Sequence, residues 1–327
     1  MSLLNKCRFP GFGALESLSA SRYQLQVGSS LGIRRCALAF CAVAVYLGGL
    51  VVNTAAQTPS SGFVSLRVLT YNIHHGAGND VCAPESTGSG KPDCGLDLPR
   101  IAAVARLHKP DVIAFQEVDR FWARSAGVDQ AAELASLLGM HSCYGANLKL
   151  AADLPDHESR EYGTLIVSRH PIDSCNNTSL PQAAAESEQR GLLVATIKLG
   201  GQKVQIANTH LHVRREDRLL QTPVVAKALA SAQTIPTVLM GDMNARPQEE
   251  SLPALLTQFR DAWAVRGEGD GLTSPSTPKA PARNRIDYIL VSPGIEVKSV
   301  QVDKSEAAVM ASDHYPVFAE LHIPKGR

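Results

Sequence analysis

Polar side chains that can bind metals or transfer protons recur where apolar stretches of the sequence end. They are Asn72 after LRVLTY, Glu117 after DVIAFQ, Asn208 and His210 in KVQIANTH, Asp242 and Asn244 in TVLMGDMN, Asp287 at the start of DYILV, and Asp313 and His314 before YPVFAEL. Side chains alternate along a strand, so Asn208 with His210, and Asp242 with Asn244, project in pairs from one face. Such strand ends lying side by side would form one cluster of carboxylates, amides and imidazoles.

The residue types in this set indicate hydrolysis of a phosphate ester. A phosphodiester is shielded from nucleophiles by its own anionic oxygens, so its hydrolysis needs a cation on those oxygens and an oriented water. Oxygen donors from Glu117, Asp313 and Asn72, without a thiolate, suit Mg²⁺, with Mn²⁺ or Ca²⁺ as alternatives, rather than structural zinc. A histidine such as His314 can carry the proton, and a neighbouring carboxylate such as Asp287 can fix its tautomer. Taken singly, each residue also fits a solvated strand end, a turn or a helix cap.

The same residues lie in seven ordered blocks that resemble the endonuclease/exonuclease/phosphatase superfamily. The blocks are 70–73 (TYNI), 116–118 (QEV), 162–164 (YGT), 208–211 (NTHL), 241–244 (GDMN), 285–288 (RIDY) and 312–316 (SDHYP). The resemblance covers roughly residues 65 to 323. That superfamily includes DNase I-like nucleases, abasic-site endonucleases, inositol polyphosphate 5-phosphatases and sphingomyelinases.

The resemblance implies an α+β fold, the DNase I-like four-layer α/β/β/α sandwich, with the active site at strand ends between the two sheets. It also implies a role for each matching residue. Glu117 would be the principal Mg²⁺ ligand with Asn72 and Asp313 beside it, Asp242 and Asn244 would position the attacking water and a phosphate oxygen, His314 with Asp287 would be the acid/base pair, and His210 would donate to a phosphate oxygen.

Three further residues are candidates for binding substrate. Tyr162 can donate a hydrogen bond to a phosphate, although it also fits a residue packed beside the sheet. Arg190, in the segment EQR, fits a phosphate contact and a structural ion pair equally well. Asn208 can orient substrate without adding repulsive charge. His74 lies on the same face as Asn72 and either lines the substrate cleft or is a surface residue.

The pattern of apolar residues predicts more strands than helices. Strands are expected near 65–73, 111–118, 162–168, 191–199, 202–211, 236–243, 285–292, 295–303 and 315–323, and helices near 98–108, 129–139, 216–232 and 249–258. Pro223 is expected to disturb the third helix. Several strands in direct succession favour a mixed-sheet α+β sandwich over a doubly wound sheet. Residues 266–284 are rich in Gly, Pro and Ser and should form a long surface loop, of a length that is often functional.

The N-terminal region has the pattern of an export signal. Residues 36–52 are apolar and free of charge, Arg34 and Arg35 precede them, and Thr54, Ala55 and Ala56 supply a small-residue cleavage site. We therefore expect residues 1–56 to be a signal peptide or an N-terminal membrane anchor, residues 57–64 a linker and residues 65–325 the catalytic domain. The protein would be exported, or anchored and associated with the membrane through residues 36–52.

Removal of the leader would leave four cysteines, Cys82, Cys94, Cys143 and Cys175. An even number suits an oxidising compartment. We expect Cys82 to pair with Cys94 and Cys143 with Cys175, which is one of three possible pairings, and four free thiols are the alternative.

Composition and charge narrow the function. The chain has 327 residues, 44% hydrophobic and 19% charged, which excludes a disordered acidic tail. Its net charge is +1, but residues 1–56 carry +4, which leaves −3 for residues 57–327. This excludes binding of nucleic acid by non-specific cationic contacts alone.

We expect a monomeric, exported Mg²⁺-dependent phosphoesterase acting on nucleic acid, a phospholipid head group or a small phosphoester. The alternatives are a sphingomyelinase-like phosphodiesterase, an envelope-tethered interaction protein or a non-catalytic binding module.

Overall fold

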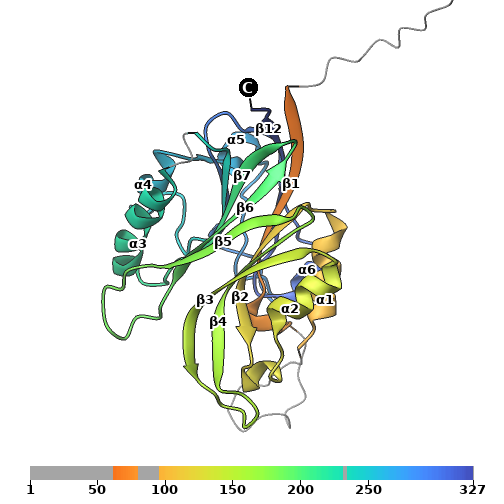
Figure 1. Cartoon of the computed structure of the whole chain (residues 1–327), viewed down its shortest axis with the longest axis vertical. Helices are drawn as coiled ribbons and strands as arrows, with labels where there is room; N and C mark the ends of the chain where they lie inside the picture. The colour runs from red at the N-terminus through yellow and green to blue at the C-terminus, as the bar shows by residue number, and fades with distance from the viewer. Residues whose placement is uncertain (1–61, 80–95, 231–233, 327) are drawn as a thin grey trace, which may run out of the picture. The chain divides into compact units, whose positions relative to one another are not determined.

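The computed structural model describes residues 62–79, 96–230 and 234–326 (Figure 1). The expected apolar segment 36–52, the cleavage site, most of the linker, and Cys82 and Cys94 lie outside these residues. Within the described ranges no helix has both the length and the apolar character needed to cross a membrane.

Two six-stranded sheets form the centre of the Gln57–Arg327 unit. The first contains, in spatial order, β11 (Glu296–Val302), β12 (Val317–Pro324), β1 (Phe63–Asn72), β2 (Val112–Arg120), β4 (Ser159–Ser168) and β3 (His141–Ala151). The second contains β5 (Ile172–Ser179), β6 (Gly191–Leu199), β7 (Gln202–His210), β8 (Thr237–Asp242), β10 (Asp287–Val291) and β9 (Arg260–Asp261). Each sheet has one parallel pair among the neighbours, β1 with β2 and β7 with β8, and the other pairings are antiparallel.

Helices cover the outer face of each sheet (Figure 1). The helices beside the first sheet are α1 (Leu98–Leu107), α2 (Gln130–Leu138) and α6 (Glu306–Ala311), those beside the second are α3 (Arg215–Ala228) and α4 (Pro253–Leu256), and α5 (Ala262–Arg266) lies against β11. Short 3-10 turns occupy His74–Gly76 and Ala123–Ser125. The layers confirm the predicted α/β/β/α sandwich of the DNase I type.

Alternation along β1 shows how the sequence builds these layers. Leu66 and Val68 pack between the two sheets, whereas Leu69 and Tyr71 face the helices. All four are fully buried, and burial of each such side chain stabilises the fold by roughly 1.5–3 kcal/mol. The same alternation directs Asn72, the last residue of the strand, toward the second sheet.

Several predicted elements differ from those observed. β3 and β5 were not predicted, because both are edge strands with mostly exposed side chains and no regular apolar alternation. The helix expected at 249–258 is a single turn in α4, while α3 continues through Pro223. β1 already begins at Phe63, inside the expected linker 57–64.

The predicted bridge between Cys143 and Cys175 is present. It joins β3 to β5, so it links the edge strand of one sheet to the edge strand of the other. Asn177 of β5 reinforces the contact by donating from Nδ2 to the Ala146 carbonyl of β3, at 3.0 Å. The sandwich is therefore closed covalently along this side.

Replacing Cys175 with Ser should lower the free energy of unfolding by about 2–4 kcal/mol, because the bridge restricts the unfolded chain across 32 residues. Chemical denaturation of Cys175→Ser, beside the exposed neighbour Ser174→Ala as control, measures the difference. Equal stability of the two variants under non-reducing conditions would contradict the prediction.

Candidate active site

Three predicted residues lie in one row across the second sheet. His210 ends β7, Asp242 ends β8 and Asp287 begins β10, and the strand register places Asp242 beside both of the others. Gly241 allows this row to form: its φ is +143°, and a Cβ at this position would lie 1.8 Å from the Thr209 carbonyl oxygen. Only glycine accommodates such a close approach of β7 and β8.

Glu117 reaches the site because β2 contains a bulge. The pairing of β2 with β4 shifts between Phe115 and Val118, and Glu117 has a φ of +59°. Phe115 and Val118 both pack on the helix side, so the bulge inserts an extra residue between them. In regular alternation Glu117 would follow Phe115 by two positions and point into that apolar layer. The bulge thus turns a carboxylate toward the other sheet.

Asn208 braces this bulge from the second sheet. Its Nδ2 donates to the carbonyls of Phe115, at 2.8 Å, and Leu165, at 3.0 Å, and its Oδ1 accepts from Gln116 Nε2 at 2.8 Å. The side chain is fully buried and all its polar atoms are used. Asn208 was expected to bind substrate, but its hydrogen bonds make it a structural tether between the sheets.

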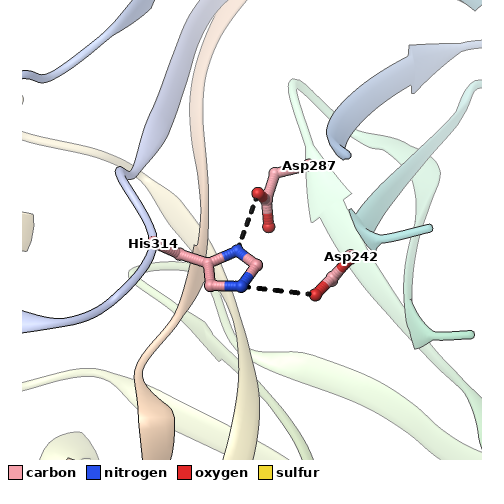
Figure 2. Close-up of side chains that lie close together, drawn as sticks. All are labelled: Asp242, Asp287 and His314. Carbon is pink, nitrogen blue, oxygen red and sulfur yellow. Dashed lines mark hydrogen bonds and ion pairs between the residues drawn. The ribbon is translucent and has the colours of Figure 1, made fainter. Parts of the chain in front are cut away.

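His314 lies between two aspartates (Figure 2). Its Nδ1 is 2.9 Å from Asp287 Oδ2, and its Nε2 is 3.8 Å from Asp242 Oδ2. Burial alone lowers the pKa of His314, but the hydrogen bond and charge of Asp287, with the charges of Asp242 and Asp313, outweigh it and hold this pKa well above its ordinary value. Burial and the charge of Asp287 raise the pKa of Asp242 to about 7.

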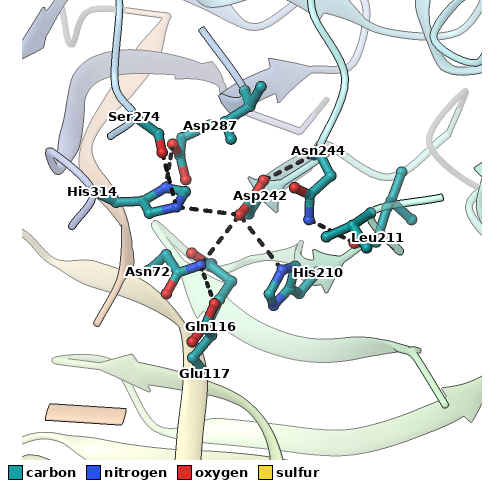
Figure 3. A network of polar contacts seen from close by, with 12 residues as sticks. Asn72, Gln116, Glu117, His210, Leu211, Asp242, Asn244, Ser274, Asp287 and His314 are labelled. Carbon is teal, nitrogen blue, oxygen red and sulfur yellow. Dashed lines mark hydrogen bonds and ion pairs between the residues drawn. The ribbon is translucent and has the colours of Figure 1, made fainter. Parts of the chain in front are cut away.

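Asn72 connects this group to Glu117 (Figure 3). Its Nδ2 donates to Glu117 Oε1 at 2.9 Å and to Asp242 Oδ2 at 3.2 Å. The Ser312 hydroxyl donates to the Asn72 carbonyl at 2.7 Å, which fixes the segment that carries His314 against the end of β1. The Asn72 side-chain amide therefore connects Glu117, on the first sheet, with Asp242, on the second sheet.

Asn244 and His210 complete the cluster on the side of the second sheet. The Asn244 main-chain amide donates to Asp242 Oδ1 at 2.8 Å, and the Asn244 side chain donates from Nδ2 to the Leu211 carbonyl at 2.9 Å. His210 Nε2 lies 3.5 Å from Asp242 Oδ2, while its buried Nδ1 has no partner among the described residues. Burial, with the charges of Arg190 and His314, lowers the pKa of His210 well below its ordinary value, so its imidazole is neutral.

The sequence profile of the Endonuclease/Exonuclease/phosphatase family matches residues 69–314, three quarters of the chain and every element that carries the cluster. The chain belongs to this family. The family is one of phosphoesterases and nucleases that commonly use divalent metal ions.

Solved structures agree with this assignment. An endonuclease/exonuclease/phosphatase from Beutenbergia cavernae is 27% identical over 80% of this chain and 72% of its own, with a TM-score of 0.59. A mannosyl-6-phosphatase from Bacteroides thetaiotaomicron shares the fold, with 20% identity over 78% of this chain and 99% of its own and a TM-score of 0.58. The human Nocturnin catalytic domain with bound sulfate also shares it, with 18% identity over 79% of this chain and 94% of its own and a TM-score of 0.57. No curated protein matches the chain.

Two groups of side chains fit the divalent metal that the family commonly uses. Glu117 and Asp313 lie close enough that Asp313, together with burial, raises the pKa of Glu117. Their carboxylate oxygens form a set of donors whose mutual repulsion a hard cation would relieve. Asn72 faces Glu117 with its Nδ2, and its Oδ1 accepts from the His74 main-chain amide at 3.1 Å. Asp242, Asp287 and His314 form a second buried group, with ligand atoms within 4.8 Å of one another. In this second group the His314 ring is already paired with both carboxylates. The first group, with the carboxylates of Glu117 and Asp313, therefore fits Mg²⁺ better.

Arg190 and Tyr162 lie on the side of the cluster near His210 and Glu117. Arg190 is 6% exposed; its Nη2 is 3.0 Å from Glu188 Oε1, and its Nε and Nη1 have no hydrogen-bond partner among the described residues. Burial and the charge of Glu117 raise the pKa of Tyr162, so its phenol stays protonated and can donate. Arg190 thus makes the structural ion pair, and its contact with a phosphate stays a prediction.

A cavity of about 660 Å³ lies elsewhere in the described part of the unit, between α5, the loop after it and β11. Trp263 and Gly271 line it, and none of the predicted site residues does. The functional assignment therefore rests on the convergence of side chains rather than on this cavity.

Sequence reasoning did not single out Gln116, Ser274 and Ser312, which support the cluster. Ser274 comes from the 266–284 segment, which was expected to lie on the surface, yet Thr273, Ser274 and Ser276 are buried. His74 also lies near the site: it and His75 have positive φ angles of 46° and 44°, and the charge of His74 lowers the pKa of Glu117.

The raised pKa of Asp242 predicts a pH-dependent stability. A carboxyl group whose pKa is raised on folding contributes stability below its unfolded pKa, about 4, and loses that contribution as the pH rises through its folded pKa. In EDTA, wild-type protein should therefore lose stability relative to Asp242→Asn between about pH 4 and about pH 7. His210 and His212 act in the opposite direction, so the difference between the two proteins in thermal unfolding is the quantity to measure. Parallel profiles would contradict the prediction.

Proposed function

We propose that the protein is an exported, Mg²⁺-dependent phosphoesterase that hydrolyses phosphodiester or phosphomonoester bonds by attack of water. The observation that carries the proposal is the contact of Asn72 with both Glu117 and Asp242, because it joins an oxygen-donor set to a paired imidazole and carboxylate. Cation binding and proton transfer are the two requirements of phosphate ester hydrolysis in water.

Glu117 and Asp313 would hold the Mg²⁺ ion, and Asn72, expected as a ligand, would instead orient Glu117 by donating to it from Nδ2. The charge of the bound ion would offset the negative charge of the phosphate oxygens. Asp242, whose Oδ1 is fixed by the Asn244 amide, would orient the attacking water. His314 would exchange a proton at Nε2, while Asp287 fixes the proton on Nδ1 and stabilises the charged ring.

The phosphate group itself would bind beside these residues. The unpartnered Nε and Nη1 of Arg190 are buried donors that an anionic oxygen would satisfy, and a charge-assisted pair of this kind is among the stronger hydrogen bonds in proteins. His210, neutral and with a free Nδ1, and Tyr162, with a protonated phenol, can add further hydrogen bonds. The cluster thus has donors for a phosphate on the side away from Asp287.

The substrate can be a nucleic acid, a phospholipid head group or a small phosphoester. The net charge of −3 for residues 57–327 disfavours tight non-specific binding to a duplex. A mannosyl-6-phosphatase shares the fold, which supports the inclusion of phosphomonoesters among the substrates to be tested. We further propose that the protein acts as a monomer.

Export is proposed on the N-terminal pattern and on the disulfide. Disulfides such as Cys143–Cys175 form and persist mainly in oxidising compartments, and the apolar residues 36–52 precede a small-residue cleavage site. The alternative, retention of residues 36–52 as an anchor, would place the same domain at the membrane.

Replacing His314 or Asp242 with Ala should reduce kcat by about 10²–10⁴-fold, because each change removes a group that handles the proton or the water. The activity to follow is Mg²⁺-dependent and EDTA-sensitive hydrolysis by residues 57–327. Suitable substrates are 4-nitrophenyl phosphate, bis(4-nitrophenyl) phosphate, supercoiled plasmid and sphingomyelin vesicles. Arg169→Ala, on an exposed side chain outside the cluster, is the control. Near wild-type turnover in both cluster variants would refute the assignment, and a folded wild-type protein inactive on every substrate would favour a binding module.

The exported product should begin at Gln57, because the small residues Thr54, Ala55 and Ala56 precede it. N-terminal sequencing of protein recovered outside the cytoplasm tests this directly. A product that retains residues 36–52 would instead identify a membrane anchor.

A further inference from the structure

The Ser274 hydroxyl lies against the free nitrogen of the His314 ring (Figure 3). Its Oγ is 3.3 Å from His314 Nε2, while Nδ1 of the same ring is 2.9 Å from Asp287 Oδ2. Ser274 is 8% and His314 7% exposed. The imidazole therefore has a polar partner at each nitrogen, and the one at Nε2 is closer than Asp242, which is 3.8 Å away.

Main-chain hydrogen bonds place this hydroxyl. The Ser274 amide donates to the Asn284 carbonyl at 3.0 Å, and the Ser274 carbonyl accepts from the amides of Arg283, at 3.0 Å, and Asn284, at 2.8 Å. The preceding residue, Thr273, accepts at its carbonyl from the Tyr315 amide at 2.8 Å. Ser274 is thus attached both to the segment before Asp287 and to the segment after His314.

A hydroxyl at this position can serve the ring nitrogen both as a donor and as an acceptor. Because the Asp287 carboxylate only accepts, Nδ1 carries a proton in every state of the pair. Nε2 then accepts a hydrogen bond when the ring is neutral and donates one when the ring is charged. A serine hydroxyl both donates and accepts, so it can pair with Nε2 before and after a proton is exchanged there.

We propose that Ser274 is a positioning residue for His314: its hydroxyl, 3.3 Å from Nε2, and the Asp287 carboxylate at Nδ1 hold the ring in one orientation, and the reacting oxygen then takes the place of the Ser274 hydroxyl at Nε2. The inference rests on the proposed function, in which His314 exchanges the proton. The spacing of Ser274, His314 and Asp287 also resembles that of a nucleophilic triad. We place the nucleophile in water instead, since Ser274 is buried within its loop and Asp242, which faces the same ring nitrogen, can orient a water there.

Three variants test the proposal. Ser274→Ala removes the hydroxyl, Ser274→Thr keeps it, and Ser276→Ala removes a matched hydroxyl two residues along that is buried but has no hydrogen-bond partner in the described part of the chain. Loss of one such hydrogen bond should lower kcat about tenfold in Ser274→Ala, with KM and Tm close to those of the wild type. Ser274→Thr should recover most of the turnover, and Ser276→Ala should match the wild type.

Nuclear magnetic resonance of protein labelled with ¹⁵N-histidine provides a readout that needs no activity. The His314 Nε2 proton, shielded by the Ser274 hydroxyl at low pH, should be visible in wild type and Ser276→Ala and lost to solvent exchange in Ser274→Ala. This separates the two inferences: an inactive wild-type protein with the expected spectra would overturn the proposed function and leave the Ser274 contact supported.

Three outcomes would overturn the role of Ser274. The first is an equal kcat in Ser274→Ala and Ser276→Ala, and the second is an unchanged His314 Nε2 signal in Ser274→Ala. The third is a loss of turnover in Ser274→Ala as complete as in His314→Ala, together with a phosphoryl adduct on Ser274 of the wild-type protein detected by mass spectrometry. The last would identify Ser274 as a nucleophile. If Ser274→Thr does not fold, the spectra of the two alanine variants decide.

Discussion

Hydrogen bonds from Asn208 across the interface between the sheets hold the polar strand ends in place. The bulge in β2 removes main-chain groups from regular pairing, and a buried carbonyl without a partner costs about 1–3 kcal/mol. Asn208 supplies donors to Phe115 and Leu165 from the opposite sheet. The orientation of Glu117 in the first sheet thus depends on an amide in the second, and the two halves of the cluster are positioned together.

The negative charge of the clustered carboxylates is balanced by a neighbouring histidine rather than by surface arginines. Glu117, Asp242, Asp287 and Asp313 lie near one another, and His314 is the cation that pairs with two of them. Backbone strain gathers in the same place. Among the described residues, seven other than glycine have positive φ angles, and His74, His75, Glu117 and Asn244 are four of these. Such conformations persist where the surrounding structure enforces them, and they concentrate at functional sites.

The strand ends of the site could be predicted from the sequence because apolar stretches stop at Asn72 and Asp242 and another begins at Asp287. The bulge could not, since no glycine or turn residue marks Gln116 and Glu117 within an apolar strand. Asn208 is of a residue type that could bind substrate. Its role as a tether follows only from the carbonyl groups that accept its hydrogen bonds, those of Phe115 and Leu165, which are distant in the sequence. Ser274 lies in a stretch whose composition indicated a surface loop, but the attachment of that stretch to the ends of two strands buries it.

The disulfide also bears on how the protein behaves at high concentration. Edge strands expose unpaired main-chain groups that can pair with another molecule. β3 and β5 lie together and are covalently joined, β9 has only two residues, and α5 packs against β11. The edge at β9 is thus short, the edge at β11 is covered by a helix, and the edges at β3 and β5 lie against each other. Reduction of the bridge between Cys143 and Cys175 would leave β3 and β5, the two longest edge strands, free to move apart and to pair with another molecule.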